Sequence, residues 1–107
     1  MEKDNKTTPT KGVDRKFLEE FATRMNVTPE QIIANDTRRV RSEIRHLYCY
    51  MRRELYDEVT FVQIAREIER TPETVFHSHR LIKGLLEIGY KKIIPMWELV
   101  KDIPESA

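Results

Sequence analysis

Apolar residues recur every three or four positions from residue 14 onward, which is the spacing of one face of an α-helix. The first such stretch should form a helix capped by Asp14. Its apolar face contains Phe17, Leu18, Phe21, Ala22 and Met25. Thr28-Pro29 predicts the start of a second, short helix through Ile32 and Ile33, because threonine caps helices well and proline fits the first helical position.

The longest predicted helix runs from about Arg38 to Leu55. Its apolar stripe comprises Val40, Ile44, Leu47, Tyr48, Met51 and Leu55. The arginines off this stripe are Arg41, Arg45, Arg52 and Arg53. Each of these either contacts a partner or belongs to a solvated face. A final short helix is expected from Pro95 to Ile103, ending before Pro104, so the pattern as a whole predicts an all-α protein.

The most informative stretch is TFVQIAREIERTPETVFHSHRLI, which begins at Thr60 and contains two helical repeats separated by a short break. Apolar or covered positions in it are Phe61, Ile64, Ala65, Ile68, Val75, His79 and Ile82. Thr60 and Gln63 form a capping-box pattern before the first repeat. Thr71-Pro72 starts the second, and Gly89 should end it. Two short helices joined by three or four residues can set the second one in the DNA major groove, so we predict a helix-turn-helix.

The surplus of basic over acidic residues lies around this stretch. The 107 residues carry 19 Lys/Arg and 18 Asp/Glu, a net charge of only +1. Residues 38–92 hold 12 basic and 8 acidic side chains, a surplus of four, whereas residues 1–37 and 93–107 are slightly acidic. The sequence pI of about 7.9 lies below the basic range of a strong phosphate binder, which predicts modest non-specific affinity for DNA.

Other classes of protein find little support. No apolar run approaches the roughly 20 residues that span a bilayer, the first twelve residues lack the apolar core of a signal peptide, and one cysteine allows no intramolecular disulfide, so we expect a cytoplasmic protein. His77 and His79 are two apart and cannot chelate a metal together on a helix. Cys49 should be a small buried hydrophobe. Without a phosphate loop or a nucleophile motif, we expect no enzyme, no cofactor and no metal.

The order of a short helix, a basic loop, a long helix and a helix-turn-helix resembles the C-terminal DNA-binding domain of the bacterial replication initiator DnaA. The likeness covers roughly residues 14–88 and is carried by VTPEQIIANDTRRVRSEIRHLYCYMRREL and TPETVFHSHRLI. It implies a Trp-repressor-like fold and double-stranded DNA as partner. Arg39 and Arg45 fall at basic positions of the family, and Arg53 falls at a lysine.

The likeness weakens where the family reads bases. The family segment opens Asp-His-Thr-Thr-Val, whereas this chain has Thr-Pro-Glu-Thr-Val at residues 71–75. The matching positions are Thr74, Val75 and His77. Basic residues of the family fall opposite Asp36, Thr37 and Glu43. The DNA site of the family is therefore not carried over to this chain.

Side chains near the start of a recognition helix reach base edges, and residues around it contact phosphates. Glu73 can accept from a cytosine amino group, Thr74 can touch a thymine methyl group, and His77 lies one turn further on. Glu73 can equally act only as a first-turn carboxylate that stabilises the helix dipole, and His79 is expected in the core. The complete predicted DNA-binding set is Arg38, Arg39, Arg41, Arg45, Arg53, Thr71, Glu73, Thr74, His77, Arg80 and Lys83.

Two functions remain open at this point. The first is sequence-specific DNA binding in replication initiation or transcriptional control, and the second is a protein-interaction module that keeps the fold without contacting DNA. We expect a disordered leader at 1–12, the DnaA C-terminal-like domain at 13–89 and an extension with a short helix at 90–107. The extension carries Ile93, Ile94, Trp97 and Leu99. It provides either a homodimer interface or a helix that folds back on the domain's own core.

Overall fold

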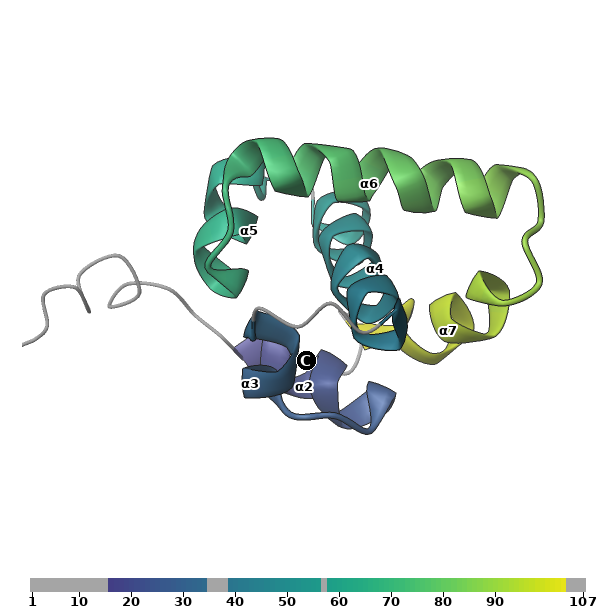
Figure 1. Ribbon diagram of the computed structural model, residues 1–107, viewed down its shortest axis with the longest axis horizontal. Helices are drawn as coiled ribbons and strands as arrows, with labels where there is room; N and C mark the ends of the chain where they lie inside the picture. The colour runs from purple at the N-terminus through teal and green to yellow at the C-terminus, as the bar shows by residue number, and fades with distance from the viewer. Residues whose placement is uncertain (1–15, 35–38, 57, 104–107) are drawn as a thin grey trace, which may run out of the picture.

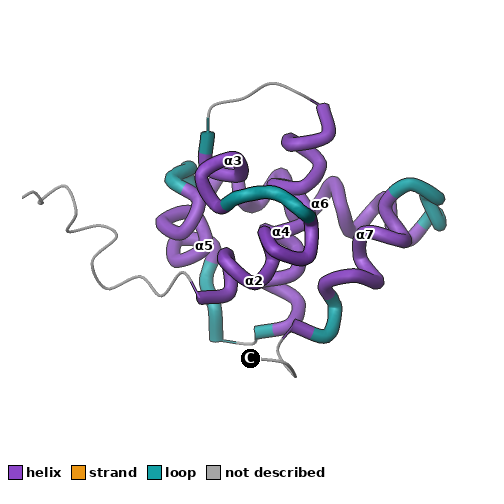
Figure 2. Tube along the Cα trace, turned by 90° about the horizontal axis from the view of Figure 1, so that it is seen from below, coloured by secondary structure: helices purple, strands orange, loops and turns teal. Residues whose placement is uncertain are grey.

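The computed structural model describes residues 16–34, 39–56 and 58–103, without the side chains of residues 39–41. Every regular element in these ranges is a helix, which confirms the all-α prediction. The elements are α2 (Lys16–Met25), α3 (Pro29–Ile33), α4 (Arg39–Leu55), α5 (Phe61–Ile68), α6 (Pro72–Glu87) and α7 (Ile93–Val100). In both views α4 lies in the middle of the molecule, and α6 crosses above it in Figure 1 (Figures 1 and 2).

Local signals determine where these helices begin. Thr28 and Gln31 form a complete capping box, in which the Gln31 amide donates to Thr28 Oγ1 at 3.1 Å and the Thr28 amide donates to Gln31 Oε1 at 2.9 Å. Thr60 accepts from the Gln63 amide at 3.1 Å, and Thr71 accepts from the Thr74 amide at 3.2 Å. All three predicted starts are confirmed. The predicted Asp14 cap and the leader lie outside the described residues.

The other helix ends follow equally local causes. At the end of α6, the Gly89 amide donates to Leu86 O and the Tyr90 amide to Leu85 O, with Gly89 at φ 70°, as in a Schellman motif. The last helix was predicted over Pro95–Ile103 but begins at Ile93 and ends at Val100. It starts earlier because the Tyr90 carbonyl already accepts from the Ile93 amide at 3.1 Å. Pro95 then lies in the first turn, where a missing amide hydrogen costs nothing.

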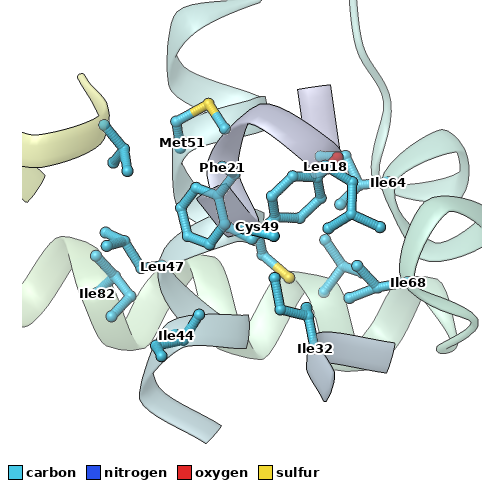
Figure 3. Close-up of a cluster of buried hydrophobic side chains, with 14 of the residues drawn as sticks. Leu18, Phe21, Ile32, Ile44, Leu47, Cys49, Met51, Ile64, Ile68 and Ile82 are labelled. Atoms are coloured by element: carbon cyan, nitrogen blue, oxygen red, sulfur yellow. The ribbon is translucent and has the colours of Figure 1, made fainter. Parts of the chain in front are cut away.

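The core forms where α2, α4, α5 and α6 meet (Figure 3). Its fully covered side chains include Leu18, Phe21, Leu47, Met51, Ile64, Ile68 and Ile82. The predicted stripe of α4 supplies the central layer, and Cys49 beside it is also fully buried, as predicted. Burial raises the pKa of the Cys49 thiol to about 12, so the thiol remains protonated and unreactive at neutral pH.

A buried ion pair joins α4 to α5 and corrects the prediction for Arg52. That side chain is only 2% exposed, neither on a solvated face nor on a DNA surface, and its Nε donates to Glu67 Oε1 at 2.8 Å. Its guanidinium lies 4.6 Å from the centre of the Phe17 ring and 4.7 Å from that of Tyr56. Tyr48 also donates to Glu67, and burial, reinforced by that carboxylate, holds the pKa of Tyr48 well above its ordinary value.

The C-terminal segment folds back on the domain. α7 packs against α2, α4 and α6, and the side chains of Ile93, Val100 and Ile103 are buried in the common core. Arg24 of α2 donates to the Leu99 carbonyl at 3.0 Å. Of the two arrangements considered for this extension, the described residues therefore adopt the one in which it covers the core of its own chain.

Candidate nucleic-acid interface

α5 and α6 are joined by a tight turn of three residues. α5 ends at Ile68, and the next residue, Glu69, adopts the left-handed conformation with φ 56° and ψ 48°. The Arg70 backbone amide then donates back to the Ala65 carbonyl at 2.9 Å. Thr71 follows as the cap of α6. Ala65, a small residue of α5, is 2% exposed. The predicted break at residues 69–71 is confirmed.

The two sides of α6 differ sharply in exposure. Val75, Ser78 and Ile82 face the interior and are at most 2% exposed. Residues on the outer side are exposed, and four of them belong to the predicted DNA-binding set. These are Glu73, His77, Arg80 and Lys83. Figure 1 shows α6 as one continuous helix, and the exposure of these four side chains places them together on its outer side.

Thr71 and Thr74 serve the helix start. The Thr71 hydroxyl accepts from the Thr74 amide at 3.2 Å and lies 2.9 Å from the Thr74 hydroxyl. Thr74 is half-buried, whereas Thr71 is exposed. Their hydroxyls are thus bound to each other. The half-burial of Thr74 leaves its methyl group less available for the predicted contact with a thymine methyl group.

Arg45 has a structural role instead of the predicted contact with DNA. Its side chain is 7% exposed, and it donates to Ile32 O at 2.8 Å and to Ala34 O at 3.0 Å. Arg70 donates to Ile33 O at 2.9 Å and also to Ala34 O at 3.0 Å. These two guanidinium groups satisfy the carbonyls at the end of α3. A buried guanidinium held this way cannot reach a phosphate, so we remove Arg45 from the candidate interface.

The predicted basic loop lies largely outside the described residues. Arg38 is among the residues not described, and only the backbone of Arg39 and Arg41, in the first turn of α4, is given. Arg53, at the other end of α4, is half-buried, and its guanidinium lies 5.6 Å from the centre of the Phe61 ring. Arg53 stays a candidate for a contact with DNA.

A groove of about 560 Å³ runs beside α6, between the end of α4 and the start of α5. Its lining includes Arg53, Phe61, Phe76, Arg80, Lys83 and Glu87. His79 also lines it, stacked 5.2 Å from the Tyr50 ring, with Nε2 2.7 Å from Glu54 Oε2. The His79 side chain is only 13% exposed, in agreement with its predicted place on the covered stripe.

His46 is a polar link that the sequence pattern did not single out. Its Nδ1 lies 2.7 Å from the Ser78 hydroxyl, which joins α4 to the inner side of α6. Burial lowers the pKa of His46, and the neighbouring Arg45 lowers it further, against a smaller opposing effect of Glu43. The residues of the described ranges contain no cluster of three or more potential metal ligands.

Comparison with protein-family models, with curated proteins and with solved structures gives no match for this chain. The resemblance to the DnaA domain thus depends on the quoted residues alone. None of the described helices combines the length and the apolar character needed to cross a membrane.

Proposed function

We propose that the protein binds double-stranded DNA sequence-specifically by inserting the outer side of α6 into the major groove. The single observation that carries the proposal is the tight three-residue turn from α5 into a capped helix whose outer side is exposed. Its 16 residues correspond to about 24 Å of helix, and the major groove of B-DNA, about 12 Å wide, admits an α-helix.

The side chains on the outer side of α6 suit this role. Glu73 and His77 lie near its start, where base edges would be reached, and Arg80 and Lys83 lie one and two turns further on, where phosphates would be reached. Arg53 lines the adjoining groove together with the two α6 cations. In this proposal the fold is Trp-repressor-like, and the protein acts in replication initiation or transcriptional control.

A protein-interaction module remains the second candidate, favoured by exposed apolar side chains outside the proposed DNA-reading positions. Leu81 is 47% exposed, Ile88 75% and Leu99 52%. Such residues occur singly on many proteins, so they carry less weight than the exposed side of α6. A homodimer through the C-terminal extension would use its exposed residues, among them Ile94 and Leu99, because Ile93 and Val100 are already buried.

The proposal is tested by incubating the purified protein with a random-sequence duplex pool at low and at moderate salt and sequencing the retained DNA. We expect an enriched motif, and a palindromic motif would indicate a dimer. Retention that is lost with salt and yields no motif would reduce the function to backbone binding. No retention at low salt would refute DNA binding and favour the interaction module.

Two matched charge variants locate the interface on the selected duplex. Lys83→Gln should weaken binding and reduce the slope of log K against log salt by about 1, because one phosphate contact is lost. Lys101→Gln removes the same charge beyond α7, where Lys101 pairs with Glu98 at 2.8 Å, and should leave the slope unchanged. Equal effects of the two substitutions would mean that overall charge, not the α6 surface, determines binding.

A further inference from the structure

The outer side of α6 carries one large apolar side chain among its charged residues. Phe76 is 41% exposed, and its neighbours one turn before and one turn after it are Glu73 and Arg80. Single exposed aromatic residues are common on protein surfaces, so exposure alone would mean little. The position of Phe76, in the second turn of α6 beside His77, is where a recognition helix contacts base edges.

Phe76 is also held in place from two sides. The Phe61 ring meets it edge to face, with the ring centres 5.7 Å apart and the planes at 81°. The Arg80 guanidinium lies 5.7 Å from the centre of the Phe76 ring. Phe61 itself is covered by Arg53 at 5.6 Å. An exposed phenyl ring held in this way loses little conformational entropy on binding. Little of the free energy gained from a contact with the ring is therefore offset by the cost of ordering it.

We propose that Phe76 determines specificity by contacting the C5-methyl group of a thymine in the major groove. This inference rests on the proposed DNA-binding function. The thymine methyl is the one apolar group that a base pair of unmodified DNA presents in that groove, and apolar side chains recognise it by burying it. Thr74, the residue first expected in this role, is half-buried, whereas the Phe76 ring is exposed.

The charges next to Phe76 fit the backbone of the same DNA. The groove beside the ring is lined by Arg53, Arg80 and Lys83, so cations lie along one flank of the proposed base contact. Of the two carboxylates in that groove, Glu54 is engaged by His79 at 2.7 Å. The arrangement places an apolar contact at the centre of the interface and phosphate-binding groups at its side, as base readout with backbone positioning requires.

Replacing thymine by deoxyuridine tests the inference, because it removes only the methyl group. Each thymine of the duplex selected by the wild-type protein is replaced in turn, and Kd is measured by fluorescence anisotropy. Burial of one methyl group corresponds to about a fourfold change in affinity. We expect replacement at one position of the duplex, or at either of two adjacent positions, to weaken binding of the wild-type protein about fourfold, and replacement at the other positions to have no effect.

Phe76→Ala should abolish this discrimination, so that the ratio of Kd for the uracil duplex to Kd for the thymine duplex falls to about 1. Phe76→Gln keeps an aliphatic stem that can pack against Phe61 but lacks the ring, and it should lose the discrimination as well. A loss in both variants shows that the ring itself, and not its packing against Phe61, is needed. The matched control is Leu81→Ala, an apolar residue of α6 that is similarly exposed at 47% and should keep the ratio. Thermal unfolding of each variant checks that it is folded.

The outcomes separate the two claims. A wild-type protein that binds no duplex overturns the proposed function and the inference together. Binding with no thymine preference at any position overturns the inference alone. The same conclusion follows if Phe76→Ala and Phe76→Gln keep the wild-type ratio.

Discussion

Replacing Glu67 by glutamine should be the most damaging conservative change in the core. Arg52 is 2% exposed, and the Glu67 carboxylate is its anionic partner in the buried pair. Breaking a buried pair by removing one partner typically costs about 3–5 kcal/mol, because the remaining charge stays buried without compensation. The aromatic rings of Phe17 and Tyr56, at 4.6 and 4.7 Å from the guanidinium, keep part of the stabilisation of the cation. We therefore expect about 3 kcal/mol, the lower end of the range.

That loss is large beside the roughly 5–15 kcal/mol by which a domain of this size is stable. It should lower Tm by roughly 12–24 °C at the usual 4–8 °C per kcal/mol. Urea unfolding followed by circular dichroism measures the free energy directly, provided the transition is two-state. The matched control is Glu20→Gln, which breaks the Arg24–Glu20 pair at 2.9 Å, where the Glu20 side chain is 41% exposed. We expect that surface change to cost less than about 1 kcal/mol.

Replacing the whole network separates the charge effect from the packing effect. Arg52→Met, Glu67→Leu and Tyr48→Phe together remove the cation, the anion and the hydroxyl that donates to Glu67. Apolar replacement of a buried network is often neutral or stabilising, so the triple variant should be more stable than Glu67→Gln. The reasoning is refuted if Glu67→Gln is as mild as Glu20→Gln, since the pair would then be solvated in solution.

Three further predictions concern backbone conformation and pH. Gly84→Ala should stabilise the protein by about 0.5–1 kcal/mol, because Gly84 is inside α6 and an added Cβ would meet open space. Gly89→Ala should destabilise it, because the backbone of Gly89 has φ 70°, which is strained for a residue with a Cβ; the Tm of each variant checks the sign. Glu69→Gly should raise stability by about 1 kcal/mol in urea unfolding, because a non-glycine residue is held there in the left-handed region at φ 56°, and a loss of stability would contradict this. Burial lowers the pKa of His46, so the unfolded chain takes up this proton at a higher pH than the folded protein does. The stability contributed by neutral His46 is therefore present above the ordinary pKa near 6.5 and is lost as the pH falls below it. The Tm of His46→Gln should fall less than that of the wild-type protein over the same pH range.

Helix positions were predictable from sequence because their causes are local. Thr28 and Thr71 each stand directly before a proline, and the cap and the fixed proline φ operate within a few residues. The 3.6-residue spacing of apolar side chains along α4 likewise identified its buried stripe. The start of α7 was misplaced because it depends on the turn through Tyr90, for which the chain has no capping side chain.

The buried arginines were not predictable from the same signals, because their partners are distant in sequence. Arg52 depends on Glu67 in another helix, and Arg45 depends on backbone carbonyls of α3, which no side-chain pattern reveals. Glu67 lies outside the apolar positions predicted for α5, so its burial, and with it the need for a cation as partner, became visible only in the structure. Phe76 was not singled out from the sequence, because it carries no charge and lies off the apolar stripe formed by Val75, His79 and Ile82.

The structural arginines also change what the net charge means for the proposed function. Arg45, Arg52 and Arg70 each donate to other groups of the protein, and Glu67 is wholly buried. Removing these three arginines and Glu67 from the 12 basic and 8 acidic side chains of residues 38–92 leaves nine and seven, a surplus of two. So small a surplus supplies little non-specific attraction to phosphates. If the protein binds DNA as proposed, long-range attraction adds little to its affinity, which comes mainly from short-range contacts of α6. The slope of its salt dependence then reports how many phosphates are contacted by groups such as Arg53, Arg80 and Lys83.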